Sequence, residues 1–227
     1  MLMILSGGGG FAKNPDAYRL FADACDKTRP VLYVALSQTP ENALGHYPAF
    51  VSLAASLGIF CTRLCPDAGF IKNIDASEYG GIFVDGGNTF RLLASLKGQG
   101  ADAKLRELVR SGVPYLGTSA GAIIAGADIM PIIYMDANAV CLEDTRGLDM
   151  IGGWSTVAHY GDSKSDFVNA ERNAAVAKLA GKFARLVALS EESAIVVRDS
   201  GAFIQGADCT VFENGTPRVI PSGGKLA

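Results

Sequence analysis

A serine flanked by small residues stands between a strand-like and a helix-like segment of the chain. Ser119 is the centre of the pentapeptide GTSAG, which follows the apolar run 113–116 and precedes the apolar run 122–125. This pattern is typical of a nucleophile elbow, a tight turn that exposes the serine hydroxyl at the sheet edge and requires glycine beside it. The turn also directs the N–H of Ala120, at the positive end of the next helix, towards a developing oxyanion. The motif predicts a serine hydrolase, and a glycine-rich packing turn is the alternative.

A serine hydroxyl needs a base at neutral pH, and histidine is the usual one. The chain has two histidines. His159 follows an apolar stretch and precedes the polar loop 161–163, which favours a position over the sheet edge. His46 lies in a helical region with no clear link to the serine, so it is interpreted as structural or surface. His159 is therefore the predicted base.

The third member of such a site is a carboxylate that orients the imidazole and stabilises its charge. Glu191 follows a predicted strand at 186–189, which would place it at a carboxyl end, whereas its neighbour Glu192 is interpreted as an exposed helix-cap residue. In the chain order of α/β-hydrolases the acid precedes the histidine. That order would require one of the acids at 128, 136, 143, 144 and 149. The residues alone leave both placements open.

A second oxyanion donor is expected in the segment DGGNTF at 85–90, directly after the predicted strand 81–84. Its two glycines let an N–H approach a substrate carbonyl with no side chain in the way. A phosphate-binding loop is the competing interpretation. Neither this segment nor the glycine run at 7–10 contains the lysine of a P-loop or a complete G-x-G-x-x-G, so phosphate binding is disfavoured.

Apolar segments of strand length alternate with segments of helical period. The predicted strands are 2–6, 30–36, 59–64, 81–84 and 113–116, and the predicted helices are 16–25, 41–57 with a break or fresh start at Pro48, 89–96 and 103–110. This alternation predicts an α/β fold with a mostly parallel sheet, helices on both faces and ligands at the carboxyl ends of the strands. Ser119 falls at such an end.

The later part of the chain is less regular. It predicts a helix at 166–179, short strands at 186–189 and 194–197, and a C-terminal β-hairpin at Asn214-Gly215 between two apolar runs. With no internal repeat and no low-complexity linker, the 227 residues are predicted to form one domain.

Composition excludes several classes of partner. The formal net charge of −3 gives no basic surplus for a nucleic acid. Five cysteines without paired CxxC spacing favour reduced thiols over disulfides or a zinc ribbon. Glycines at 7–10 interrupt the apolar start too early for a signal peptide or a membrane span. We therefore expect a cytoplasmic protein without nucleic-acid or membrane partners, whose oligomeric state, a homodimer included, stays open.

Taken together, several segments resemble peptidase E, the α-aspartyl dipeptidase, to which cyanophycinase is related. They are DGGNTFRLL (85–93), GTSAGA (117–122), AHY (158–160) and SEE (190–192), and they extend in order over most of the chain. The resemblance implies a fold similar to the flavodoxin-like class I glutamine amidotransferase domain. It also implies a triad of Ser119, His159 and Glu191 in that chain order, with oxyanion N–H groups from Gly87 and Ala120.

The resemblance further implies substrate contacts at Asn88 and Arg172. Arg172, in the segment NAERN (169–173), matches the place of the family arginine that binds the aspartate side chain of the substrate, although the flanking residues differ. A solvated helix arginine is the alternative. Asp85 stands where the family usually has a third glycine, which could alter the charge near the substrate amine.

The expected function is that of a serine peptidase that hydrolyses dipeptides or very short peptides with an N-terminal Asp, without a metal or an organic cofactor. A cyanophycinase-like or other acyl hydrolase on the same fold is one alternative. A non-catalytic binding or regulatory domain is another. A glutamine amidotransferase is disfavoured because that chemistry uses cysteine where this chain has Ser119.

Overall fold

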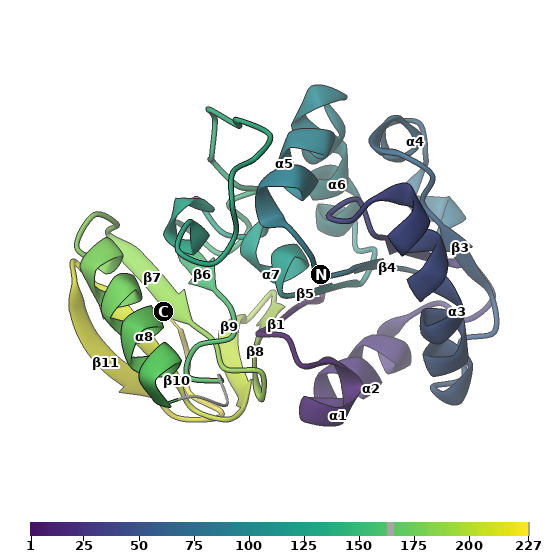
Figure 1. Ribbon diagram of the computed structural model, residues 1–227. Helices are drawn as coiled ribbons and strands as arrows, with labels where there is room; N and C mark the ends of the chain where they lie inside the picture. Colours follow the sequence, from purple (N-terminus) through teal and green to yellow (C-terminus); the bar gives the residue numbers. More distant parts are fainter. Residues whose placement is uncertain (163–165, 227) are drawn as a thin grey trace.

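The computed structural model describes residues 1–162 and 166–226, which are arranged around two β-sheets (Figure 1). Among these residues the larger sheet has seven strands in the order β3-β2-β4-β5-β1-β8-β9. They are β1 (Met3–Ser6), β2 (Val31–Val34), β3 (Thr62–Leu64), β4 (Gly81–Val84), β5 (Tyr115–Thr118), β8 (Ser193–Arg198) and β9 (Gly201–Gly206). The strands from β3 to β1 are parallel, and β8 and β9 continue the sheet in antiparallel orientation. The predicted mostly parallel sheet is confirmed.

Helices cover both faces of this sheet. Successive strand residues point to opposite faces, so Met3 and Leu5 belong to one buried cluster and Ile4 to another. The cluster around Ile4 includes side chains of α2 (Pro15–Ala24) and α3 (Pro40–Ser56). The cluster around Met3 includes side chains of α4 (Ala68–Lys72), α5 (Thr89–Gly98), α6 (Ala101–Arg110) and α7 (Ala120–Ile123). Shorter elements complete this part: α1 (Gly10–Lys13) and the 3₁₀ turns η1 (Ala76–Glu78) and η2 (Met130–Ile132).

A smaller sheet stands beside the first, with α8 (Asp166–Ala180) drawn over it in Figure 1. Its strand order in the described residues is β11-β10-β7-β6, and only β6 and β7 are parallel. The strands are β6 (Ser155–Val157), β7 (Arg185–Ala188), β10 (Cys209–Glu213) and β11 (Thr216–Ile220). Asn214 and Gly215 join β10 to β11 with φ of 49° and 81°, as a two-residue hairpin turn requires. The hairpin is confirmed, but this second sheet goes beyond the prediction.

The predicted break at Pro48 is wrong. Helix α3 continues through this residue, although a proline inside a helix removes one backbone hydrogen bond. Ala43 on one side of Pro48, and Phe50 and Ala54 on the other, are buried against the sheet. This apolar face holds both halves of the helix, while the proline itself is exposed to solvent.

Candidate active site

Ser119 lies in the sharp turn between β5 and α7. Its backbone has φ 51° and ψ −111°, an unfavourable conformation for a residue with a side chain and one that a nucleophile elbow imposes. The N–H of Ser119 donates to the carbonyl of Ser6 on the neighbouring strand β1 at 3.0 Å. A Cβ on Gly117 would lie 2.4 Å from the carbonyl oxygen of Gly121, so the turn has no room for a larger residue there. The small residues of the motif are therefore needed to expose the hydroxyl.

His159 lies between Ser119 and Glu191. The Nε2 atom of His159 is 2.9 Å from Oγ of Ser119, and its Nδ1 atom is 2.8 Å from Oε1 of Glu191. The side chains of His159 and Glu191 are 27% and 23% exposed, so the site is shielded but reachable from solvent. We call these three hydrogen-bonded residues the Ser–His–Glu array. The structure thus brings together the three side chains that the sequence analysis singles out.

Four of the five earlier candidate carboxylates have other partners. Asp128 accepts the N–H of Met130, Asp136 that of Thr89, and Asp149 that of Gly153, while Asp144 pairs with Lys97 and Arg146. Glu192 pairs with Lys13 on the surface. The geometry therefore places Glu191, not an earlier acid, beside the imidazole.

Both sheets contribute to the position of His159. This residue follows β6 of the smaller sheet, and its own N–H donates to the carbonyl of Gly7 beyond β1 of the larger sheet at 3.1 Å. Glu191 lies in the connection between β7 and β8, which belong to different sheets. Its N–H donates to the carboxylate of Asp162 at 2.6 Å. The pKa of the Asp162 carboxyl group is raised, mainly because the group is partly buried. Ser163, the last residue of the predicted loop 161–163, lies outside the described residues.

The glycine run at 7–10 supports the array, a role that the sequence analysis does not assign. A Cβ on Gly8 would lie 2.3 Å from Cε1 of His159, and one on Gly9 would lie 2.8 Å from Cβ of Glu191. Gly8 also has φ +123°, which residues with a side chain rarely adopt. The imidazole therefore packs directly on the backbone of this loop. The glycines are evident in the sequence, but their supporting role could not be inferred there because Gly8 and His159 are far apart in the chain.

We expect Gly8→Ala to reduce kcat by roughly 100-fold, since a displacement of a catalytic group by about 1 Å has that effect. Backbone strain should also lower the free energy of unfolding by about 1–3 kcal/mol. Gly112→Ala is the matched control, because Gly112 has φ +102° with open space around it. Kinetics and urea unfolding of both variants check this, and equal loss of kcat in the two would show that strain alone is responsible.

Gly86 passes close to Ser119, and Gly87 follows it against Ser37. A Cβ on Gly86 would lie 3.3 Å from Cβ of Ser119, and Gly87, with φ +132°, would collide with Ser37 if it had a side chain. The hydroxyl of Ser37 donates to the carbonyl of Gly86 and so fixes this loop. Within the part of the chain that the structure describes, no hydrogen bond uses the N–H of Gly87 or of Ala120. Both predicted oxyanion donors therefore have an N–H available for a ligand.

Asn88 caps the N-terminus of α5. Its Oδ1 accepts the N–H of Arg91 at 2.9 Å, and its Nδ2 donates to the carbonyl of Ala137 at 2.9 Å. Both ends of the amide are thus engaged in holding the helix and the segment around 137. The predicted substrate contact of Asn88 stays a prediction.

Arg172 is half-buried on α8, close to Tyr134. Burial raises the pKa of Tyr134 to about 12, and the charge of Arg172 acts in the opposite direction. Two residues after Tyr134, the carboxylate of Asp136 accepts the N–H of Thr89, which directly follows the loop of Gly86 and Gly87. The predicted aspartate-binding arginine therefore lies beside a segment that contacts this loop.

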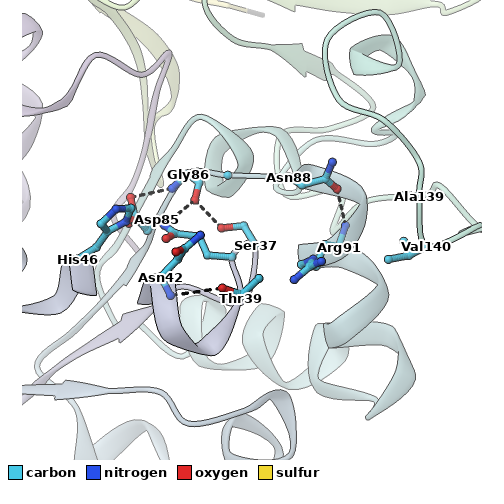
Figure 2. A pocket seen from close by; sticks show the side chains of 12 residues that line it. Ser37, Thr39, Asn42, His46, Asp85, Gly86, Asn88, Arg91, Ala139 and Val140 are labelled. Atoms are coloured by element: carbon cyan, nitrogen blue, oxygen red, sulfur yellow. Dashed lines mark hydrogen bonds between the residues drawn. The ribbon is translucent and has the colours of Figure 1, made fainter. Parts of the chain in front are cut away.

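A pocket of about 610 Å³, lined mainly by polar residues, opens beside Gly86 and Gly87 (Figure 2). Its lining includes Gly86, Gly87 and Asp85, with Arg91 on α5 and the exposed His46 on α3. The interpretation of His46 as a surface residue holds, but the sequence analysis did not place it at a pocket. The pocket is large enough for a short peptide.

None of the helices in residues 1–162 and 166–226 has the length and apolar character of a membrane span. The same residues contain no group of three or more His, Cys, Asp or Glu side chains placed to hold a metal ion.

Comparison with known proteins extends these observations. The profile of Peptidase family S51 matches residues 2–205. An uncharacterized peptidase of Listeria monocytogenes is 36% identical over 174 residues, which are 75% of this chain and 82% of that protein. Peptidase E of a Shewanella species (strain W3-18-1) is 30% identical over 155 residues, 65% of this chain and 63% of that protein. The crystal structure of a peptidase from an acI-B1 Actinobacterium shares the fold, with a TM-score of 0.75 at 16% identity over 100% of this chain and 96% of that one. Because the profile covers most of its length, the chain belongs to peptidase family S51 and is a serine peptidase.

Proposed function

We propose that this peptidase hydrolyses dipeptides or very short peptides through an acyl-enzyme on Ser119. The observation that carries the proposal is the pair of hydrogen bonds that joins Ser119 to His159 and His159 to Glu191. This arrangement supports general-base activation of a serine by an imidazole that a carboxylate orients.

In this mechanism the carboxylate of Glu191 accepts the Nδ1–H of His159, which leaves Nε2 free to accept the hydroxyl proton of Ser119. Oγ of Ser119 attacks the peptide carbonyl carbon, and the N–H groups of Gly87 and Ala120 donate to the resulting oxyanion. His159 then gives its proton to the leaving amine as the C–N bond breaks. A water molecule, deprotonated by His159, then attacks the ester carbon. The C–Oγ bond breaks, His159 returns the proton to Oγ of Ser119, and the acid is released.

For the substrate we propose an N-terminal Asp whose side-chain carboxylate binds Arg172. The resemblance to peptidase E and the position of Arg172 beside Tyr134 support this assignment. A guanidinium fork suits a carboxylate because it donates two parallel hydrogen bonds. We further propose a cytoplasmic location, supported by the reduced state expected of the five cysteines.

A fluorophosphonate probe tests the reaction class. We expect labelling of one residue, Ser119, by peptide mapping of the wild-type protein. A screen of Asp-X, Glu-X, Asn-X and β-linked aspartyl dipeptides then tests the substrate, with Asp-X expected to be hydrolysed best. Absence of labelling would contradict the serine mechanism, and preference for the β-linked substrates would favour a cyanophycinase-like hydrolase.

Substitution of Arg172 tests the specificity. Loss of a charged hydrogen bond in a shielded pocket costs about 2–4 kcal/mol, so Arg172→Ala should reduce kcat/KM for Asp-Leu by roughly 30- to 1,000-fold. Arg172→Lys keeps the charge but loses the fork, so it should not restore the rate fully. Asn-Leu is the control substrate, and its kcat/KM should hardly change. If both substrates lose activity equally, Arg172 has a structural role instead.

A further inference from the structure

Asp85 lies where two pockets meet. Its side chain lines the polar pocket of about 610 Å³ in Figure 2, and it also lines a neighbouring pocket of about 220 Å³. The smaller pocket has aromatic walls, which include Tyr33, Phe50 and Phe83. Asp85 itself is half-buried. A carboxylate in this position is reachable by a ligand but partly removed from water.

Neutral donors hold this carboxylate. The hydroxyl of Tyr33 and Nε2 of Gln38, the latter at 3.1 Å, donate to Oδ2. The N–H of Gly86 donates to Oδ1 at 2.8 Å. These bonds fix the orientation of the group without neutralising its charge. The site is therefore preorganised for a cation.

No cationic partner for Asp85 occurs among the ion pairs of residues 1–162 and 166–226. His46 and Arg91 face the same pocket from α3 and α5, and Figure 2 shows Arg91 on the opposite side from Asp85. Burial, followed by the charge of Asp85, raises the pKa of Tyr33. A negative charge in surroundings of low polarity is stabilised strongly by a cationic ligand.

The position of Asp85 relative to the reaction narrows the choice of cation. Asp85 directly follows β4. The next residues are Gly86, on which a Cβ would lie 3.3 Å from Cβ of Ser119, and Gly87, which has an available N–H. In a peptide with a free N-terminus, the α-nitrogen and the first carbonyl carbon are attached to the same Cα. When the first carbonyl oxygen of the substrate binds the N–H of Gly87, the α-ammonium group therefore stays close to this loop. A lysine ε-ammonium group could reach Asp85 only through its longer side chain.

We infer that Asp85 is a specificity residue that binds an ammonium group of the substrate, the α-ammonium of a free N-terminus. This inference rests on the proposed function, because it takes the first peptide bond as the one attacked by Ser119. It makes the protein an aminopeptidase-type enzyme towards short peptides, one that rejects N-blocked substrates.

Binding to the Ser119→Ala variant tests this without turnover. Calorimetry compares Asp-Leu with N-acetyl-Asp-Leu, and Ala-Leu with N-acetyl-Ala-Leu, so that the ammonium group is the only charge that changes within a pair. We expect the free amine to bind roughly 10- to 100-fold more tightly in each pair, as a charged hydrogen bond provides. Adding Asp85→Asn should bring both ratios close to one. Nα-acetyl-Lys-Leu is the side-chain arm, and we expect it to bind no better than N-acetyl-Ala-Leu.

Asp23→Asn is the matched control. Asp23 is exposed near the end of α2, which leads to the start of β2, whereas Asp85 follows the end of β4. The Asp23→Asn variant should preserve the ratios. Asp85→Ser is a second variant in case the asparagine misfolds, because its hydroxyl can still accept a hydrogen bond from Tyr33. Equal binding of free and acetylated peptides to Ser119→Ala, or an unchanged ratio after loss of Asp85, overturns the inference. Tight binding of Nα-acetyl-Lys-Leu would overturn the assignment to the N-terminus.

The two proposals fail in different ways. Absence of fluorophosphonate labelling in the wild-type protein contradicts the serine mechanism, whatever the binding ratios are. Labelling at Ser119 combined with indifference to acetylation contradicts only the role of Asp85.

Discussion

Ser119→Ala is expected to abolish peptide hydrolysis and leave the fold intact. The substitution removes a hydroxyl whose hydrogen bond in the structure is with Nε2 of His159, and the backbone turn does not depend on that group. Loss of a triad nucleophile costs ~10⁴-fold or more in kcat. The rate of Asp-Leu hydrolysis tests the loss of activity, and the thermal unfolding curve of the variant tests whether the fold is intact.

The two histidines provide a matched comparison for the same site. His159→Ala should lose activity to a similar extent as Ser119→Ala, because the two residues act as a unit. His46→Ala should leave kcat nearly unchanged, since His46 has no role in proton transfer, and any effect of its position at the pocket should fall on KM. Turnover at the wild-type rate by Ser119→Ala, or a larger loss of kcat in the His46 variant than in the His159 variant, would contradict the assignment.

Glu191→Gln should reduce kcat by roughly 10⁴-fold, because a neutral amide no longer stabilises the imidazolium or imposes the right tautomer on His159. The amide is nearly the same size as the carboxylate, so the loss should fall on kcat and not on stability. Steady-state kinetics combined with urea unfolding separate these effects.

Asp136→Asn and Asp128→Asn are the controls for this prediction. In each, an asparagine oxygen can still accept the backbone N–H of Thr89 or Met130 that the aspartate now accepts. Both variants should therefore keep most of their activity. A larger loss of kcat in either of them than in Glu191→Gln would show that the acid lies between the serine and the histidine after all.

Local patterns predicted the parallel part of the fold well. β4 has the predicted bounds, and β1, β2 and β5 lie within about two residues of theirs, because short apolar runs between glycines and prolines mark buried strands. The elbow at Ser119 was visible for the same reason. Its small residues are a local requirement of the turn.

In the smaller sheet, β7 and the hairpin of β10 and β11 lie close to the predicted strand and hairpin, but β6 and the pairing of these strands into a separate sheet could not be predicted from such patterns. β6 has only three residues, Ser155–Val157, and all are buried although two are polar, so neither its length nor its polarity marks a strand. β9 of the larger sheet, which was not predicted either, begins and ends in glycine. Such segments become strands through partners elsewhere in the chain. Glu191 is a similar case, since residue types left several acids open and only the three-dimensional contact places one of them beside His159.

The pairing of β1 with β8 has a consequence for how the protein is made. Met3 pairs with Val197, so β1 gains this neighbour only after the residues between 3 and 197 have been synthesised. Ser119, His159 and Glu191 come from widely separated segments, and contacts of this kind form late in folding. A ribosome-bound chain that ends before β8 lacks this edge of the central sheet and the support for Glu191. We therefore expect the nascent peptidase to be inactive until β8 has been synthesised and has paired with β1.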